Sequence, residues 1–136
     1  MGGRPRSVML VKGNYGRAGA WTESLGVAAA LQEMMLQSWD GALRIFPAWP
    51  RALDASFGTF RAEGAFLVSA SWSRGAVTSL EVRSEKGGRC RLYPPWPGGI
   101  IVADGEGRPV EAAADAWERT GFDTRPGGFY RISKRP

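Results

Sequence analysis

The sequence predicts a mainly β protein, a two-layer antiparallel β-sandwich with one N-terminal α-helix. Glycine and proline are frequent, with 19 and 9 copies over 136 residues, and this favours short strands joined by turns over long helices. Beyond residue 41, short runs rich in apolar residues recur at regular spacing, which is typical of a sandwich. Only one stretch, near the N-terminus, has helical periodicity instead.

The composition is that of one ordinary globular domain. Hydrophobic residues make up 43% and charged residues 23% of the chain, so neither disorder nor a fibrous repeat is indicated. A chain of this length buries roughly two thirds of the surface that its unfolded form exposes. One hydrophobic core is therefore expected.

The first 40 residues contain one predicted helix and one short apolar run. The run, Val8–Val11, is long enough for a single strand in a glycine-rich segment. The helix is expected over Thr22–Ser38, with Thr22 as its N-cap. Its core-facing stripe comprises Leu25, Ala28, Ala29, Gln32, Met35 and Leu36. We expect residues 1–40 to form an N-terminal segment and residues 41–136 to form the β-sandwich domain.

Turn residues separate the strands that we predict after Asp40 and Gly41. Gly75, Gly87 and Gly105 each lie in a short hairpin loop. The predicted strands are Ala42–Phe46, Phe57–Arg61, Ala65–Trp72, Val77–Ser84, Arg89–Tyr93, Ile100–Ala103, Pro109–Ala112, Trp117–Phe122 and Gly128–Ser133. Seven to nine short strands of this kind fit two packed sheets.

Alternation of residues assigns the faces of the central strands. Phe66, Val68 and Ala70 fall on one face of their strand, which we expect to point into the core. In the next strand, strict alternation places Val77, Ser79, Glu81 and Arg83 opposite Thr78, Leu80 and Val82. A meander is expected to join the strands Ala65–Trp72, Val77–Ser84 and Arg89–Tyr93. Cys90 is expected to point inward.

Residue types exclude several classes of catalytic site. The sequence contains no histidine and one cysteine, which removes imidazole-dependent triads and structural zinc sites. No phosphate-binding glycine loop or dinucleotide fingerprint is present. Two carboxylates about 5–10 Å apart can hydrolyse a glycoside, but spacing singles out no pair among Glu23, Glu33, Asp40, Asp54, Glu63 and Glu81. We therefore predict no catalytic residue, no metal site and no cofactor.

Six tryptophans are many for a chain of this length. An exposed indole can stack on a sugar ring, and the candidates for such a carbohydrate-binding role are Trp49, Trp72 and Trp96. Two of them stand beside prolines and the third ends a strand, positions where an aromatic residue also packs into the end of a sandwich. Packing in the core or at a domain interface is favoured for most of the tryptophans, and sugar binding is the alternative.

The net charge of +5 raises the question of nucleic acid. Lysine and arginine are spread along the chain with acidic residues between them, so a nucleic-acid-binding β-domain is the weaker alternative and a solvated basic surface is favoured. No apolar stretch approaches the ~20 residues that cross a bilayer, and no leader with a cleavage site is present. We expect a chain without a membrane partner and without a targeting signal.

A resemblance to a known family is found from Gln32 to Pro50, QEMMLQSWDGALRIFPAWP. This segment resembles the junction in glycoside hydrolase family 95 and its relatives, the α-L-fucosidase and α-galactosidase group, where the last helix of an (α/α)6 barrel runs into a C-terminal β-domain. The similarity continues through Asp54 to Ser71 and through Val82 to Trp96, and more loosely to the final hairpin.

The resemblance implies a non-catalytic accessory domain. In such enzymes the catalytic carboxylates lie in the barrel, and a motif with histidine, aspartate and asparagine precedes the last helix. Gly13-Asn14-Tyr15-Gly16 matches that motif only superficially, since Lys12 replaces the aspartate, so no catalytic residue is transferred. The implied partner is the catalytic barrel, or a second copy bound through the helix Thr22–Ser38, where Val27 and Leu31 lie beside the main stripe.

Overall fold

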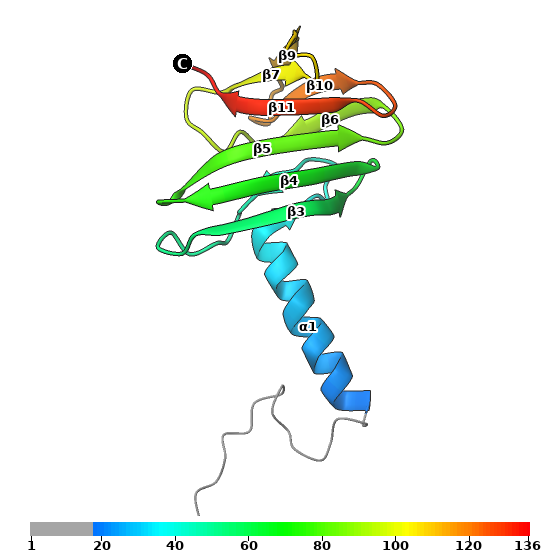
Figure 1. Cartoon of the computed structure of the whole chain (residues 1–136), viewed down its shortest axis with the longest axis vertical. Coiled ribbons are helices and arrows are strands. Elements are labelled where there is room, and N and C mark those ends of the chain that lie inside the picture. The colour runs from blue at the N-terminus through cyan, green and yellow to red at the C-terminus, as the bar shows by residue number, and fades with distance from the viewer. Residues whose placement is uncertain (1–17) are drawn as a thin grey trace, which may run out of the picture. The chain divides into compact units, whose positions relative to one another are not determined.

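The computed structural model describes residues 18–136, and their side chains from residue 23. The chain divides into two compact units, residues 1–33 and residues 34–136. The helix α1 (Ala18–Met35) is the described part of the first unit and ends in the second (Figure 1). The strand predicted at Val8–Val11 lies outside the described residues.

Antiparallel strands make up the second unit. They are β1 (Leu36–Gln37), β2 (Arg44–Ile45), β3 (Ala55–Ala62), β4 (Phe66–Ser73), β5 (Ala76–Ser84), β6 (Gly88–Leu92), β7 (Ile100–Asp104), β8 (Pro109–Val110), β9 (Ala112–Ala114), β10 (Thr120–Thr124) and β11 (Phe129–Lys134). The mainly β fold class with one helix is confirmed for the described residues.

The strands form two larger sheets and one small one. The six-stranded sheet has the order β3-β4-β5-β11-β7-β8, and the three-stranded sheet the order β6-β10-β9 (Figure 1). β1 pairs only with β2. Side chains from both larger sheets enter one core: the ring of Phe122 on β10 lies 5.4 Å from the ring of Tyr130 on β11. This arrangement agrees with the predicted two-layer sandwich.

The predicted three-strand meander is wrong at its last strand. β4 pairs with β5 as expected, but β6 pairs with β10 in the other sheet. Gly87 and Gly88, at the turn into β6, have φ values of 78° and 99°. The side chains of Cys90 and Leu92 on β6 are fully buried. A local turn signal marks where a chain bends, whereas the burial of these two side chains decides which sheet the next strand joins.

The face prediction is confirmed for β4 and wrong at the start of β5. Phe66, Val68 and Ala70 are buried on the same face of β4. Val77 is also buried, with Leu80, because the pairing shifts register between Ser71 and Trp72. An extra residue in a bulge moves one side chain to the other face, so strict alternation fails there.

A second register shift lies in the edge strand β3, between Phe57 and Phe60. Thr59 has a φ of 63° in this bulge, and its N–H donates to the side-chain oxygen of Ser69 at 3.0 Å. The bulge therefore takes one backbone donor of the edge strand out of the regular ladder.

Both predicted ends of the helix are wrong. α1 already begins at Ala18, so Thr22 lies within it and does not cap it, and it ends at Met35 instead of Ser38. Leu36 and Gln37 leave the helix to pair with β2, and the N–H of Phe46 donates to the carbonyl oxygen of Met35 at 2.7 Å. Strand pairing and the burial of Leu36 prevail over the helical periodicity of the sequence.

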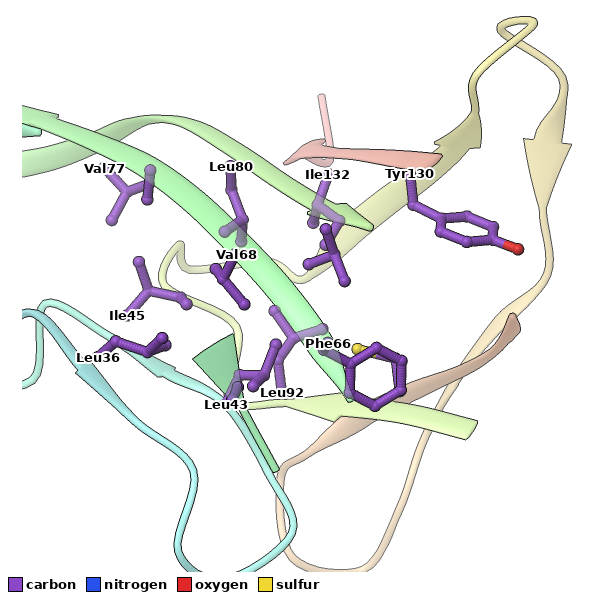
Figure 2. Packing of buried hydrophobic residues seen from close by; sticks show 14 of the residues in the cluster. Leu36, Leu43, Ile45, Phe66, Val68, Val77, Leu80, Leu92, Tyr130 and Ile132 are labelled. Atoms are coloured by element: carbon purple, nitrogen blue, oxygen red, sulfur yellow. The ribbon is translucent and has the colours of Figure 1, made fainter. Parts of the chain in front are cut away.

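The segment after α1 closes the core. Leu36, Leu43 and Ile45 lie among side chains of both larger sheets (Figure 2). The N–H of Leu43 donates to the carbonyl oxygen of Arg91 at 2.8 Å, and its carbonyl oxygen accepts from the N–H of Tyr93 at 3.0 Å. These two bonds attach the segment to β6 in parallel orientation.

The helix taken by itself is apolar on every side. Its only charged residues are Glu23 and Glu33, while Leu25, Val27 and Leu31 are 68%, 48% and 46% exposed. A helix with this composition usually lies in a protein interior. Within residues 18–136, no helix has the length and the apolar content that crossing a membrane requires.

Candidate functional site

The three tryptophans predicted to bind sugar are half-buried and pack against the core. They are Trp49, Trp72 and Trp96. The indole N–H of Trp49 donates to the carbonyl oxygen of Leu53 at 2.9 Å, and that of Trp96 to Val77 at 2.8 Å. The indole nitrogen of Trp72 is buried without a hydrogen-bond partner among the described residues.

Two of these indoles share one aromatic cluster. The ring of Phe46 lies 6.1 Å from Trp49 and 5.6 Å from Trp72. Phe57 joins it at 5.4 Å and stacks on Phe60 at 4.6 Å. The cluster joins the 46–49 segment to β3 and β4. Trp96 makes none of these ring contacts, so the structure brings together two of the three predicted site residues.

Among the tryptophans whose side chains the structure describes, Trp39 and Trp117 have the largest exposure, at 68% and 72%. Trp39 belongs to a stacked group in the β1–β2 turn: the guanidinium of Arg44 lies 4.2 Å from the ring centre of Tyr93 and 5.3 Å from that of Trp39. Asp40 forms an ion pair with Arg44 at 2.7 Å. Such stacking stabilises a cation by about 0.5–1 kcal/mol at exposed sites, so this group orders an exposed indole.

Three of the six carboxylates considered as catalytic candidates, Asp40, Asp54 and Glu81, are engaged in separate places. A hydrogen bond from Arg44 holds the pKa of Asp40 below its usual range, which suits an ion pair and opposes the role of a proton donor. Asp54 accepts from the N–H of Arg74 at 3.2 Å, and Glu81 faces Arg131 at 3.5 Å. In residues 18–136, no group of three or more metal-ligating side chains is present.

Two turns use the same aspartate–arginine arrangement. Asp104 accepts from the N–H groups of Glu106 and Arg108 at 3.0 and 2.9 Å, and its second oxygen accepts from the Arg108 side chain at 2.8 Å. Asp115 accepts the equivalent three bonds, from the N–H groups of Trp117 and Arg119 and from the Arg119 side chain. The backbone N–H of Arg108 is the main cause that keeps the pKa of Asp104 low. Both carboxylates therefore fix a hairpin.

A cleft of about 700 Å³ opens beside the first of these turns. One wall is the β7–β8 hairpin with Glu106 and Arg108. The other is the end of β10 with Asp123 and the β10–β11 loop with Arg125. Tyr130 lines its base, and in Figure 2 the hydroxyl of this residue points away from the aliphatic side chains of the core. The volume lies within the range of small-molecule sites.

A buried polar network holds the second wall. The Thr124 hydroxyl lies 2.6 Å from the carbonyl oxygen of Gly88 and 2.9 Å from the hydroxyl of Ser84. The N–H of Ser84 donates to Gly128 at 2.8 Å. The hydroxyl of Tyr130 accepts from the N–H of Arg125 at 2.8 Å. The loop is thus fixed at several points.

Sequence reasoning missed both the Arg44 group and the cleft. The spacing of Asp40 and Arg44 was a usable signal, and so was the repeated spacing of Asp104–Arg108 and Asp115–Arg119. Tyr93 gave no signal, because it reaches Arg44 through the bridge between Leu43 and Leu92. Arg125 gave none either, because its approach to the β7–β8 hairpin depends on the pairing of β11 with β7.

Comparison with known proteins gives one family. The family described as glycoside hydrolase family 95, C-terminal domain, matches residues 37–132. No curated protein matches the chain. The matched range covers the strands from β2 to β10 and most of β11, and so contains both the Arg44 group and the cleft.

Proposed function

Since the chain belongs to the glycoside hydrolase family 95 C-terminal domain family, we propose that it is a non-catalytic accessory domain that packs against a catalytic (α/α)6 barrel. The proposal extends to the α-L-fucosidase and α-galactosidase group, which the sequence resembles between residues 32 and 96. In this role the chain contributes interface and stability, and the proton-transfer groups belong to the barrel.

The observation that carries this proposal is the apolar surface of α1. Leu25, Val27 and Leu31 are exposed on a helix that has two charged residues in 18. Burying one such side chain is worth about 1.5–3 kcal/mol, so a protein surface that covered several of them would be strongly favoured. The helix ends just before the family match begins at residue 37. Its place directly before the matched range supports the proposal that a barrel joins the β-domain through this helix.

Co-purification with a barrel tests the proposal. A family 95 enzyme from which the C-terminal domain has been removed would be co-expressed with this chain, wild type or carrying Leu25→Asp and Leu31→Asp. We expect the wild type to co-elute with the barrel and to raise its melting temperature, and the double variant to do neither. Ile101→Asp is the matched control. Ile101 has the same size and the same exposed fraction as Leu31, 46%, but it lies on β7 and not on the helix.

An activity assay could overturn the accessory-domain proposal. The chain alone is expected to show no turnover of aryl fucosides or aryl galactosides. Robust turnover by the purified chain that is abolished by Glu23→Gln would place an active site in this protein and end the accessory-domain proposal.

Self-association is the alternative use of the same helix. Two copies could cover each other's apolar side chains, and Gly26 and the adjacent alanines would allow close approach of the helices. Light scattering coupled to gel filtration separates the two possibilities: a dimer that the substitutions at Leu25 and Leu31 dissociate would favour a second copy as the partner.

Sugar binding by Trp49, Trp72 and Trp96 is a second candidate function. The buried indole nitrogen of Trp72 has no acceptor among the described residues, so a rearrangement that let it meet a sugar hydroxyl would satisfy that donor. Titration of tryptophan fluorescence with oligosaccharides tests this function, and Trp72→Phe should remove a saturable signal if the function is correct.

A further inference from the structure

We propose that the cleft between the β7–β8 hairpin and the β10–β11 loop binds a neutral oligosaccharide. The choice of a sugar rests on the proposed function as a glycoside hydrolase domain. The site itself rests on the geometry of Glu106, Asp123, Arg125 and Phe129, and it is distinct from the three tryptophans considered above.

Hydrogen bonds within each wall fix the shape of the cleft. Asp104 ties the hairpin through two backbone bonds and an ion pair with Arg108 at 2.8 Å. The opposite loop is held by the Thr124 network and by the bond from the Arg125 N–H to Tyr130. Binding to preformed walls avoids much of the entropy cost of ordering a loop.

Polar groups at the cleft remain available to a ligand. The guanidinium of Arg125 makes no hydrogen bond or ion pair with any residue that the structure describes. Glu106 and Asp123 are 72% and 82% exposed, and each contacts an arginine through one oxygen, at 3.0 and 3.2 Å. Arg125 thus brings five guanidinium N–H donors to a cleft that is also lined by two carboxylates with free lone pairs.

An aromatic side chain completes the site. Phe129 is half-buried on the cleft wall, and the guanidinium of Arg131 lies 5.8 Å from its ring centre. Gly105 lies beside the ring without a side chain of its own, since an added Cβ would be 3.8 Å from a ring carbon. A sugar presents apolar CH groups on one face, and these pack on such a ring.

The charge of the cleft favours a neutral ligand. Three carboxylates and two guanidiniums line it, and Arg89 pairs with one of these carboxylates from β6 at 3.2 Å, so neither an anion nor a cation finds an excess of opposite charge. A metal ion is not favoured either, since the acids here do not form a ligand cluster in the described structure. A hydroxyl both donates and accepts, which matches adjacent arginine and carboxylate groups.

Amide chemical shifts of the full chain, titrated separately with maltotriose, xylotriose, raffinose and the anionic trigalacturonic acid, test the inference. We expect saturable shifts at residues 105–108 and 123–130 with at least one neutral sugar, at millimolar Kd. Arg125→Ala should weaken that binding about tenfold, because it removes a charged donor. The matched control Arg51→Ala, an exposed arginine outside the cleft, should leave the affinity unchanged.

Three results would overturn the inference: no saturable shifts with any neutral sugar, shifts confined to the surroundings of Trp49, Trp72 and Trp96, or tighter binding of trigalacturonic acid than of every neutral sugar. Spectra of the Arg125→Ala variant establish that it is folded before its affinity is compared. The titration uses this chain without a barrel, so its failure leaves the accessory-domain proposal intact, and a failed co-purification leaves the titration interpretable.

Discussion

Gly128 lies where the structure leaves no room for a side chain. A Cβ added there would meet the Tyr130 hydroxyl at 2.6 Å, a ring carbon of Tyr130 at 2.8 Å and the carbonyl oxygen of Arg125 at 2.9 Å. Overpacking of this kind typically costs 1–3 kcal/mol. Because one of the three contacts is with backbone, we place Gly128→Ala near the upper end and expect it to lower the free energy of unfolding by about 3 kcal/mol.

A double-mutant cycle tests whether the cost of Gly128→Ala arises from the contact with Tyr130. Tyr130→Phe alone removes the acceptor of the Arg125 N–H, which lies 2.8 Å away, and should cost about 1–2 kcal/mol. In Gly128→Ala the tyrosine must already move and lose that bond, so the double variant should be about 1 kcal/mol more stable than the sum of the single effects predicts.

Urea unfolding followed by tryptophan fluorescence measures the free energy of unfolding of the wild type, the two single variants and the double variant. Gly58→Ala is the control, since no atom lies within 4 Å of its added Cβ, and its effect should stay below about 1 kcal/mol. If Gly128→Ala is as mild as this control, or if the two substitutions in the cycle are additive, the described packing of Tyr130 against Gly128 is incorrect.

Three further predictions follow from single residues. The pKa of Asp104 is lowered in the folded protein. Its stabilising effect is therefore present above the pKa of the unfolded chain and is lost as pH falls through the pKa of the folded protein. In urea titrations from pH 7 to pH 3, the free energy of unfolding of Asp104→Asn should fall less steeply than that of the wild type. Glu118 has a φ of 61°, and Glu118→Gly should raise the unfolding free energy by up to about 1 kcal/mol, an expectation that an unchanged or lower melting temperature would contradict. Burial raises the pKa of Cys90 to about 12, so the native thiol should not react with a disulfide reagent at pH 8 until urea unfolds the chain, and rapid native labelling would show that β6 is accessible.

The strand pattern of the second unit could be predicted because it is local. Alternation of Phe66, Val68 and Ala70 placed β4 correctly, and glycine-containing turns marked the ends of most strands. The partner of β6 could not be predicted, since Cys90 and Leu92 are buried by residues distant in sequence. The end of α1 was missed for a similar reason: β1 forms only when β2 is present to pair with it.

The candidate sites were less predictable than the fold. The sequence predicted sugar binding by Trp49, Trp72 and Trp96 from its tryptophan content. The structure places all three against the core, and sugar binding by them stays a prediction. The cleft depends on Arg125 and Phe129, two common residues that carry no motif. Their proximity to the hairpin at Glu106 follows from the pairing of β11 with β7, and that pairing joins segments about 30 residues apart in the chain.

The bulge in β3 and the two-residue length of β8 affect how copies of this protein meet. These strands are the outer members of the six-stranded sheet, and an uninterrupted outer strand would offer its amides to a neighbouring molecule for continuous strand addition. The bulge between Phe57 and Phe60 interrupts the regular geometry of β3 on one side, and the other side offers two residues. Crowded solutions of the protein should therefore resist fibril growth by extension of this six-stranded sheet.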